Sequence, residues 1–251
     1  MEACAREDAD RLKTDLGTHF YPLVFDVCDS TAIAQAAKET SDLLNGQHLA
    51  ALINNAGIAI MGPLEFIPSE KIEQQFEVNV FGLLKVTQAF LPLLKATNGN
   101  AGKIINISSV SGRISSPFVA LYSASKFAVE ALSDGLRREL FIYGIDVISI
   151  QPGPTKSAIW DKSQGQGDAY LDTPYGDILK GFDQNVEGIE KRAIPTIKVA
   201  EKILLAIRKK RPKTRYIVAK NAAILRFISN LGPARIIDQL LTSRFKKYIR
   251  K

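Results

Sequence analysis

Short runs of branched apolar residues alternate with longer amphipathic stretches along most of the chain. The short runs lie at 21–26, 49–54, 103–108 and 146–151. Nearly continuous apolar runs of this length are typical of parallel strands that are covered on both faces. The longer stretches, which repeat apolar residues at helical spacing, lie at 30–44, 69–95 and 122–143. The alternation predicts βαβ units with right-handed crossovers, and therefore an α/β fold with a doubly wound, Rossmann-like parallel sheet.

The pattern becomes less regular after residue 152. Residues 155–195 are polar and contain several glycines, but they also include four aromatic residues, Trp160, Tyr170, Tyr175 and Phe182. A long loop with such aromatic residues is typical of a flap over a site. A helix at 196–209 and a last strand at 215–218 are predicted to follow. We therefore predict one domain over residues 1–220, with a flap at 155–195, and a C-terminal extension over residues 221–251.

Composition excludes several classes of protein. Of the 251 residues, 46% are hydrophobic and 24% are charged, as in an ordinary globular protein. The two cysteines and two histidines match neither a disulfide framework nor the spacing of a metal site, so we predict no metal. The first fifteen residues are charged and lack the apolar core of a signal peptide. These features favour a cytoplasmic protein.

Positive charge is concentrated at the C-terminal end. Residues 198–251 contain 16 Lys/Arg against Glu201 and Asp238, which gives +14, so the remaining residues carry −7 of the total of +7. Apolar residues alternate with these cations from Ile224 to Lys247. A basic amphipathic helix of this kind can lie on an anionic membrane surface, or it can cover a substrate pocket or a dimer face. Nucleic acid is the weakest alternative, because no nucleic-acid-binding motif accompanies the charge.

Polar motifs follow the predicted strands at the carboxyl edge of the sheet, where doubly wound sheets bind their ligands. In chain order they are Asp26, Asn54-Asn55-Ala56-Gly57, Ser108-Ser109 and Pro152-Gly153. Tyr122 and Lys126 come next, four residues apart and therefore on one helical face. A Tyr–Lys pair seen alone is usually a solvated helix face. Together with the other motifs, in this order, it predicts a catalytic site.

At these residues, and over residues 2–220, the chain resembles the short-chain dehydrogenase/reductase family. The resemblance rests on Asn54-Asn55-Ala56-Gly57, on Asn79 in Asn79-Val80-Phe81-Gly82, on Ser109 thirteen residues before Tyr122, and on Tyr122-x-x-x-Lys126. It implies hydride transfer between a nicotinamide cofactor and an alcohol or carbonyl. By the resemblance, Tyr122 is the acid/base and Ser109 steadies the substrate oxygen. Lys126 assists Tyr122 and grips the cofactor ribose, and Asn79 holds a relay water.

Elementary chemistry agrees with these roles. A phenol titrates near 10, and a lysine one helical turn away, together with an oxidised nicotinamide, is expected to lower the pKa of Tyr122. The Ser109 hydroxyl can donate to an oxygen on which negative charge develops. Asn79 also has a simpler interpretation, in which its amide satisfies a buried backbone group.

The resemblance implies further contacts with the cofactor. The residues concerned are Arg6, Asp26, Asn54, Ala56, Gly57, Tyr122, Lys126, Pro152, Gly153, Thr155 and Ser157. Asp26 would contact the adenine, although a plain helix N-cap is an equally good interpretation. Residues 152–157 resemble the turn on the nicotinamide side, with Ser157 where the family commonly has threonine. Thr155 and Ser157 would bind the carboxamide, or would only begin the flap.

One motif of the family is missing from the sequence. The family opens with a strand and a Thr-Gly-x-x-x-Gly-x-Gly turn, whose amides hold the pyrophosphate at a helix N-terminus. No such turn occurs here, and Glu2-Ala3-Cys4-Ala5-Arg6 resembles the end of the family's second strand. We therefore expect the chain to begin in mid-fold, with unpaired strand edges and weakened cofactor binding. Arg6 at that strand end would pair with a 2′-phosphate, which favours NADP(H) over NAD(H).

Two hypotheses for the function follow from these observations. The first is an NADP(H)-dependent oxidoreductase that acts on a lipophilic alcohol or carbonyl; its class of substrate is suggested by the apolar residues of the flap and the tail. The alternative is a non-catalytic scaffold or subunit that keeps the site but has lost the phosphate-binding turn. The resemblance also implies a homo-oligomer formed through the helices at 69–95 and 122–143. The basic tail adds the hypothesis of peripheral membrane contact.

Overall fold

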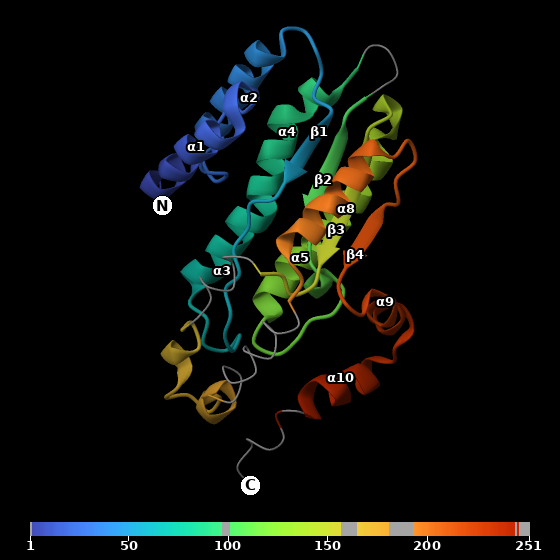
Figure 1. Ribbon diagram of the computed structural model, residues 1–251. Coiled ribbons are helices and arrows are strands. Elements are labelled where there is room, and N and C mark those ends of the chain that lie inside the picture. Colours follow the sequence, from blue (N-terminus) through green and yellow to red (C-terminus); the bar gives the residue numbers. More distant parts are fainter. Residues whose placement is uncertain (1, 97–100, 157–164, 181–192, 244, 246–251) are drawn as a thin grey trace.

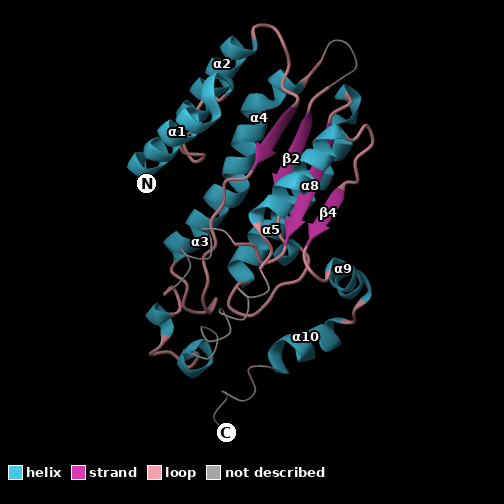
Figure 2. Cartoon of the chain, viewed as in Figure 1, coloured by secondary structure: helices cyan, strands magenta, loops and turns pink. Residues whose placement is uncertain are grey.

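The centre of the protein is a four-stranded parallel sheet with the strand order β1-β2-β3-β4. The computed structural model describes residues 2–96, 101–156, 165–180, 193–243 and 245. The strands are β1 (Ala51–Asn54), β2 (Lys103–Ile107), β3 (Asp146–Pro152) and β4 (Arg215–Val218). Figure 2 shows their arrows side by side and pointing the same way. The predicted α/β fold with a Rossmann-like parallel sheet is therefore confirmed.

Helices cover both faces of this sheet (Figure 1). The helices α4 (Leu83–Leu94) and α5 (Ala120–Glu139) lie on one face, and α8 (Thr196–Arg208) lies on the other. Successive residues of β2 therefore point into different clusters: Ile104 packs with Leu94, whereas Ile105 packs with Ala206. Burial on both faces explains why the strands are nearly continuous apolar runs in the sequence.

The helix α2 (Ser30–Leu44) stands beside α4 at the β1 side of the sheet (Figure 1). The Asp29 side chain accepts hydrogen bonds from the amides of Thr31 and Ala32, at 2.8 and 3.0 Å, and so caps the helix. Ile33 and Ala36 pack in one cluster with residues of α4. The alternative interpretation of Asp26 as this cap was wrong.

The segment that contains Arg6 is a helix and not the end of a strand. The helix α1 spans Glu2–Leu16, the short helix η1 (Gly17–His19) follows it, and Arg6 is exposed on α1. The sequence prediction was therefore wrong on this segment. Alanine, glutamate, arginine and leucine are strong helix formers, and no described strand lies beside these residues to pair with them.

Residues 21–26 were predicted as a strand, but they are extended and unpaired. A strand needs a neighbour for its backbone hydrogen bonds, and within the described residues β1 is paired only with β2. Consequently Tyr21 and Val24 are 62% and 44% exposed, and Ile53 of β1 is 43% exposed. Leu23 and Phe25 are partly buried and pack against the α2–α4 cluster.

The stretch predicted as one helix over 69–95 consists of three parts. The helix α3 (Ser69–Phe76) continues through a π-helical turn, η2 (Glu77–Gly82), into α4. By length and composition this helix, Ser69–Leu94, is long and apolar enough to cross a membrane. However, 44% of the apolar window is buried, and Val86, Phe90 and Leu94 are core residues, as in the core helix of a globular domain.

The remaining described elements are three short 3-10 helices and two helices near the C-terminus. They are η3 (Val110–Gly112), η4 (Leu140–Tyr143), η5 (Asp168–Tyr170), α9 (Ala222–Leu231) and α10 (Ala234–Ser243). The helices α9 and α10 follow β4 and lie beyond the carboxyl ends of the strands (Figure 1). Both carry exposed apolar side chains, among them Phe227 at 66% and Leu240 at 59%.

Gly112 lies where the chain is packed tightly between Ser108, after β2, and Lys126 of α5. A Cβ atom at Gly112 in η3 would lie 2.8 Å from Ser108 Oγ and 2.9 Å from the Lys126 carbonyl oxygen, whereas one at Gly135 in α5 would meet nothing within 4 Å. We expect Gly112→Ala to lower the free energy of unfolding by roughly 1–3 kcal/mol through overpacking. Gly135→Ala should be neutral or stabilising, because alanine is the better helix former. Urea denaturation of both variants measures the difference, and equal effects would contradict this packing.

Candidate active site

The candidate catalytic residues lie at the carboxyl ends of the strands and on the first half of α5. Ser109 follows β2 and caps η3 by accepting a hydrogen bond from the Ser111 amide at 3.0 Å. Tyr122 and Lys126 lie one turn apart on α5, which packs against η3. The fold therefore brings the residues predicted from the strand-end motifs to one edge of the sheet.

Asn79 joins the loop after β1 to α5. Its Oδ1 accepts from the Ile58 amide at 2.8 Å, and its Nδ2 donates to the Ile58 carbonyl at 3.0 Å and to Ser125 Oγ at 3.0 Å. The side chain is almost fully buried in the π-helical turn η2. A π-turn of this kind is frequent at functional sites. The simpler interpretation of Asn79, in which it satisfies a buried backbone group, fits these contacts, and the relay water stays a prediction.

Two residues that the sequence analysis missed complete this connection. Gln75 donates from Nε2 to the Ile58 carbonyl at 2.9 Å and accepts from the Ile60 amide at 2.8 Å. Ser125 donates to the Tyr122 carbonyl at 2.7 Å while accepting from Asn79. Their signal in the sequence was spacing, because Gln75 precedes Asn79 by one helical turn and Ser125 adjoins Lys126.

Lys126 is buried beneath this edge of the sheet, with 5% of its surface exposed. Its Nζ donates to the Ile107 carbonyl oxygen at 2.9 Å and lies 5.7 Å from the centre of the Tyr122 ring. Burial lowers the pKa of Lys126 from 10.5 to about 8, and the negative charge of Glu130, one turn further along α5, opposes part of that shift. With a pKa of about 8, Lys126 gains and loses its proton close to neutral pH.

The pKa of Tyr122 is raised, contrary to the prediction from the sequence. Burial raises the pKa of the phenol, and a hydrogen bond with Ser109 lowers it by less. The expected lowering by Lys126 is not among the causes, because burial also disfavours the lysine's charge. In the protein without a cofactor, Tyr122 therefore keeps its proton at neutral pH, as a general acid must.

Asn54 is part of a buried hydrogen-bond network that crosses the sheet. Its Nδ2 donates to Thr87 Oγ1 and to Asn106 Oδ1, both at 2.9 Å. Asn106 in turn donates to Ser133 Oγ on α5, also at 2.9 Å. The Asn54 amide is therefore directed into the protein, where it holds the end of β1 to α4 and β2.

Gly57 leaves room for a ligand beside Lys126. A Cβ at this position would lie 3.3 Å from Asn79 Oδ1 and 3.6 Å from Lys126 Nζ, so a side chain here would fill the space around the amine. Lys126 uses one of its three N–H donors within the described residues. The neighbouring Ala56 is exposed. These observations fit a nicotinamide ribose beside Lys126, whereas the sequence contains no glycine-rich turn for the pyrophosphate.

Three of the other predicted cofactor residues, Pro152, Gly153 and Thr155, lie around the same edge of the sheet. Pro152 ends β3, and the Gly153 amide donates to the Val218 carbonyl at 3.0 Å. Thr155 forms an isolated bridge with Ile194 at the base of the flap. Asp26 is exposed, and its Oδ1 accepts from the Cys28 amide at 2.9 Å. Ser157 lies outside the described residues, and Arg6 is on α1.

The described part of the flap packs on the loop that follows β1. Gln166 donates to the Ala59 carbonyl at 3.1 Å and accepts from the Met61 amide at 2.8 Å. Tyr170 packs against a buried cluster formed by Ile60, Ile67 and Leu121. Leu121 directly precedes Tyr122 in the sequence. The flap aromatics Trp160 and Phe182 lie outside the described residues. The flap thus packs on an apolar cluster that includes Leu121, on the same helix as Tyr122.

Comparison with known proteins identifies the family. A family model for short chain dehydrogenases matches residues 2–167. The NADPH-dependent 3-dehydrocapnine reductase of Ornithobacterium rhinotracheale is 41% identical over 244 residues, which cover 96% of this chain and 86% of the relative. This chain belongs to the short-chain dehydrogenase/reductase family. Members of the family are oxidoreductases, so the resemblance found in the sequence is confirmed.

Other members of the family agree with this assignment. Human retinol dehydrogenase 16 is 30% identical over 257 residues, which cover 96% of this chain and 79% of the relative. The crystal structure of a short-chain dehydrogenase from Burkholderia cenocepacia in complex with NADP is similar with a TM-score of 0.67 and 26% identity, over 92% of this chain and 82% of the other. A nicotinamide cofactor is therefore consistent with this family member.

The pKa of Lys126 gives the stability of the protein a characteristic pH dependence. The folded value of about 8 lies below the ordinary 10.5. Between these values the unfolded chain binds a proton that the folded chain does not, so rising pH favours folding. Below pH 8 both states carry the proton and this contribution is constant. We expect the wild type to gain stability over Lys126→Met across that interval, by up to about 1.4 kcal/mol per pH unit.

The measurement is chemical denaturation of both proteins from pH 7 to pH 10.5. All other titrating groups are present in both proteins, so the difference between the two stability curves reports the titration of Lys126. Parallel stability curves over the whole range would contradict the lowered pKa of Lys126.

Proposed function

We propose that this family member is an NADP(H)-dependent oxidoreductase that interconverts a lipophilic carbonyl and the corresponding alcohol. The observation that carries the proposal is the placement of Ser109 and Tyr122 at the carboxyl edge of the sheet, where the Ser109 hydroxyl lowers the pKa of the phenol against the effect of burial. The buried Lys126 amine lies 5.7 Å from the centre of the Tyr122 ring. A nicotinamide cofactor supplies or accepts the hydride when bound. Every other step belongs to residues of this chain.

In the direction of reduction, Ser109 and Tyr122 bind the carbonyl oxygen from two sides. Negative charge develops on that oxygen, and two preorganised hydroxyl donors stabilise it better than reorganising water does. Tyr122 then gives up its proton to the oxygen. The raised pKa of Tyr122 keeps that proton in place until the substrate arrives.

Lys126 stabilises Tyr122 after the proton has left. A buried amine with a pKa of about 8 can be protonated at that point, which compensates the phenolate. Asn79 and Ser125 fix the backbone on either side of the pair, since they join the loop after β1 to α5. Asn54 acts indirectly, by holding the end of β1 in place.

The preference for NADP(H) over NAD(H) has one support. The relative that is 41% identical is described as NADPH-dependent. Arg6, from which the sequence analysis inferred this preference, gives no such support in its exposed position on α1. The adenine contact of Asp26 and the carboxamide contacts of Thr155 and Ser157 are part of the same proposal.

A lipophilic substrate is supported by the apolar residues that the described part of the flap packs against. Ile60, Ile67 and Leu121 form a buried cluster with Tyr170 of the flap. Phe66 and Phe118 both contact the ring of Tyr175 edge to face, with centroids 6.1 and 5.9 Å apart. One relative is described as a retinol dehydrogenase, an enzyme of a lipophilic alcohol.

The alternative named in the sequence analysis, a non-catalytic scaffold or subunit, is distinguished from this proposal by turnover. A folded wild-type protein that gives no turnover with NADPH or NADH would favour this candidate.

We also propose that the protein is cytoplasmic and forms a homo-oligomer, as is typical of the family. The exposed apolar residues of η4, such as Phe141 at 73% and Ile142 at 65%, support an oligomer contact there. The basic extension over 221–251 adds the proposal of a peripheral contact with anionic membranes, supported by the exposed apolar side chains of α9 and α10.

Replacing Tyr122 tests the proposed acid/base directly. We expect Tyr122→Phe to lower kcat by about 10²–10⁴-fold, because the substrate oxygen loses its proton donor. The matched control is Tyr143→Phe, which removes a phenol hydroxyl from η4, where Tyr143 is 42% exposed. Steady-state assays report turnover and circular-dichroism melts report folding. Full turnover in a folded Tyr122→Phe protein would remove Tyr122 from the mechanism.

The apolar surroundings predict a dependence on substrate chain length. Each buried methylene contributes about 0.8 kcal/mol, so kcat/KM for linear alkyl ketones should rise about fourfold per added carbon until the apolar surface is filled. The control series carries a terminal hydroxyl at each length, which cannot be buried without a partner. The idea fails if both series give the same kcat/KM at every length.

A further inference from the structure

A large cleft lies beside α5, separate from the candidate catalytic residues. Its volume is about 1120 Å³, and residues of α5, β3, β4, α8 and α9 line it. That volume exceeds the usual 300–1,000 Å³ of a small-molecule pocket. Ser109, Tyr122 and Lys126 are not among the residues that line it. The proposed oxidoreductase chemistry therefore makes no use of this cleft.

The lining of the cleft is strongly positive. Its charged side chains are Arg113, Lys202, Lys213, Arg215, Arg226 and a single carboxylate, Glu130. Arg215 is already paired, with its Nε 2.7 Å from Glu130 Oε2 and its Nη2 2.9 Å from Asp134 Oδ1. Ser149 holds the other oxygen of Glu130. The other four cations form no ion pair within the part of the chain that the structure describes, so the cleft carries uncompensated positive charge.

Arg113 is one of these cations, and it is partly buried. Its guanidinium donates to Ser229 Oγ at 2.9 Å, to Asn230 Oδ1, and to Gln151 Oε1 at 3.4 Å, all of which are neutral acceptors. Burial lowers the pKa of Arg113, and so do the positive charges of Arg215 and Arg226. Glu130 opposes these effects, but Arg113 is close enough to two other guanidinium groups to be repelled by both, which an anion would relieve.

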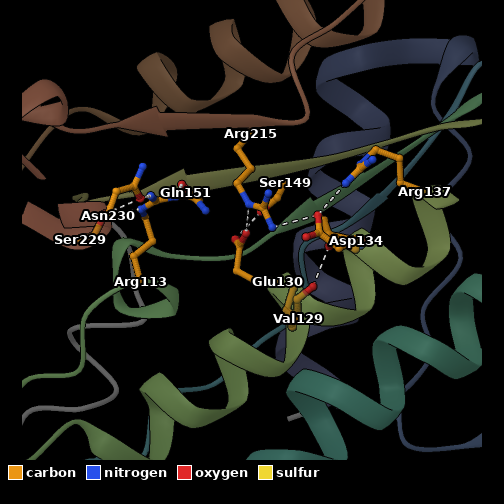
Figure 3. Close-up of polar contacts among 12 residues, drawn as sticks. Arg113, Val129, Glu130, Asp134, Arg137, Ser149, Gln151, Arg215, Ser229 and Asn230 are labelled. Atoms are coloured by element: carbon orange, nitrogen blue, oxygen red, sulfur yellow. Dashed lines mark hydrogen bonds and ion pairs between the residues drawn. The ribbon is translucent and has the colours of Figure 1, made fainter. Parts of the chain in front are cut away.

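Gln151 supplies a donor without an acceptor. The side chain is fully buried at the end of β3, lines the cleft, and has no hydrogen-bond partner for Nε2 among the described residues. Figure 3 shows Gln151 beside Arg113 and Asn230, next to the Arg215–Glu130 pair. A buried, unpaired donor costs about 1–3 kcal/mol, which a ligand with an acceptor oxygen would recover.

We propose that this cleft binds a tetrahedral oxyanion, a phosphate or sulfonate, carried on a small organic group. Donors reach the cleft from β3, from the loop after η3 and from α9, and a group with three outward oxygens can accept from several directions at once. Phe127, Tyr216 and Ile217 line other parts of the cleft and offer apolar surface to the organic group. The proposal does not depend on hydride transfer.

The test is calorimetric titration of the full chain with hexyl phosphate, inorganic phosphate and 1-hexanol at constant ionic strength, without nicotinamide cofactor. We expect both phosphates to bind and hexanol not to bind. Tighter binding of hexyl phosphate assigns the site to an organic ester, whereas equal affinities assign it to the free ion. Because no turnover is measured, failure here is distinct from failure of the proposed function.

Two arginine variants show whether the cleft is where binding occurs. Arg226→Gln removes an exposed cation of α9 that lines the cleft, and Arg235→Gln removes an exposed cation of α10 that does not. We expect Arg226→Gln to raise Kd about tenfold or more, through loss of a charge-assisted hydrogen bond, and Arg235→Gln to leave Kd within about twofold. Equal effects of the two variants would overturn the proposal, as would the absence of binding by either phosphate.

Gln151→Leu adds a readout that a purely structural role would not produce. Leucine fills a similar volume and removes the unpaired donor, so the thermal midpoint should stay the same or rise. Phosphate binding by the same variant should weaken by about tenfold. A variant that melts as the wild type does and binds phosphate equally well would exclude Gln151 from the site and contradict the proposed donor set.

Discussion

The polar residues on the buried face of α5 need hydrogen-bond partners, and satisfying them ties this helix to every other part of the site. Ser125 accepts from Asn79 of the π-helical turn, Lys126 donates to the end of β2, and Glu130 pairs with Arg215 of β4. Each bond links α5 to a different element. A buried group left without its partner would cost more than the bond itself contributes, so the helix is held in one position.

That same burial determines the proton affinities of the proposed catalytic pair, Tyr122 and Lys126. Removing Tyr122 and Lys126 from water disfavours the charged form of each, which keeps the phenol protonated and brings the amine to a pKa of about 8. A proton donor and a nearby group that can become positive are what a developing alkoxide requires. The network around α5 therefore serves both the fold and the proposed reaction, and the oxyanion cleft lies beside its Glu130–Arg215 pair.

Periodicity and strand-end motifs predicted the paired strands, the main helices and the position of the catalytic pair, because burial on both faces of the sheet leaves a clear pattern. The pattern failed at residues 21–26, since an apolar run does not show whether a strand neighbour exists to pair with it. It also failed at Arg6, where helix propensity prevailed. Gln75 and Ser125 were missed because each has a partner far away in sequence, the Ile58 carbonyl for Gln75 and the Asn79 side chain for Ser125. The pKa of Tyr122 depended on a degree of burial that no local motif encodes.

The central claim is that this family member transfers hydride from a nicotinamide to a carbonyl carbon with Tyr122 as the proton donor. The most direct measurement uses NADPH deuterated at both C4 positions and a linear alkyl ketone, with mass spectrometry of the alcohol. The account predicts an alcohol with one deuterium on the former carbonyl carbon and none exchanged with water. Unlabelled alcohol, or no alcohol from a protein shown to be folded in the same sample, would contradict it.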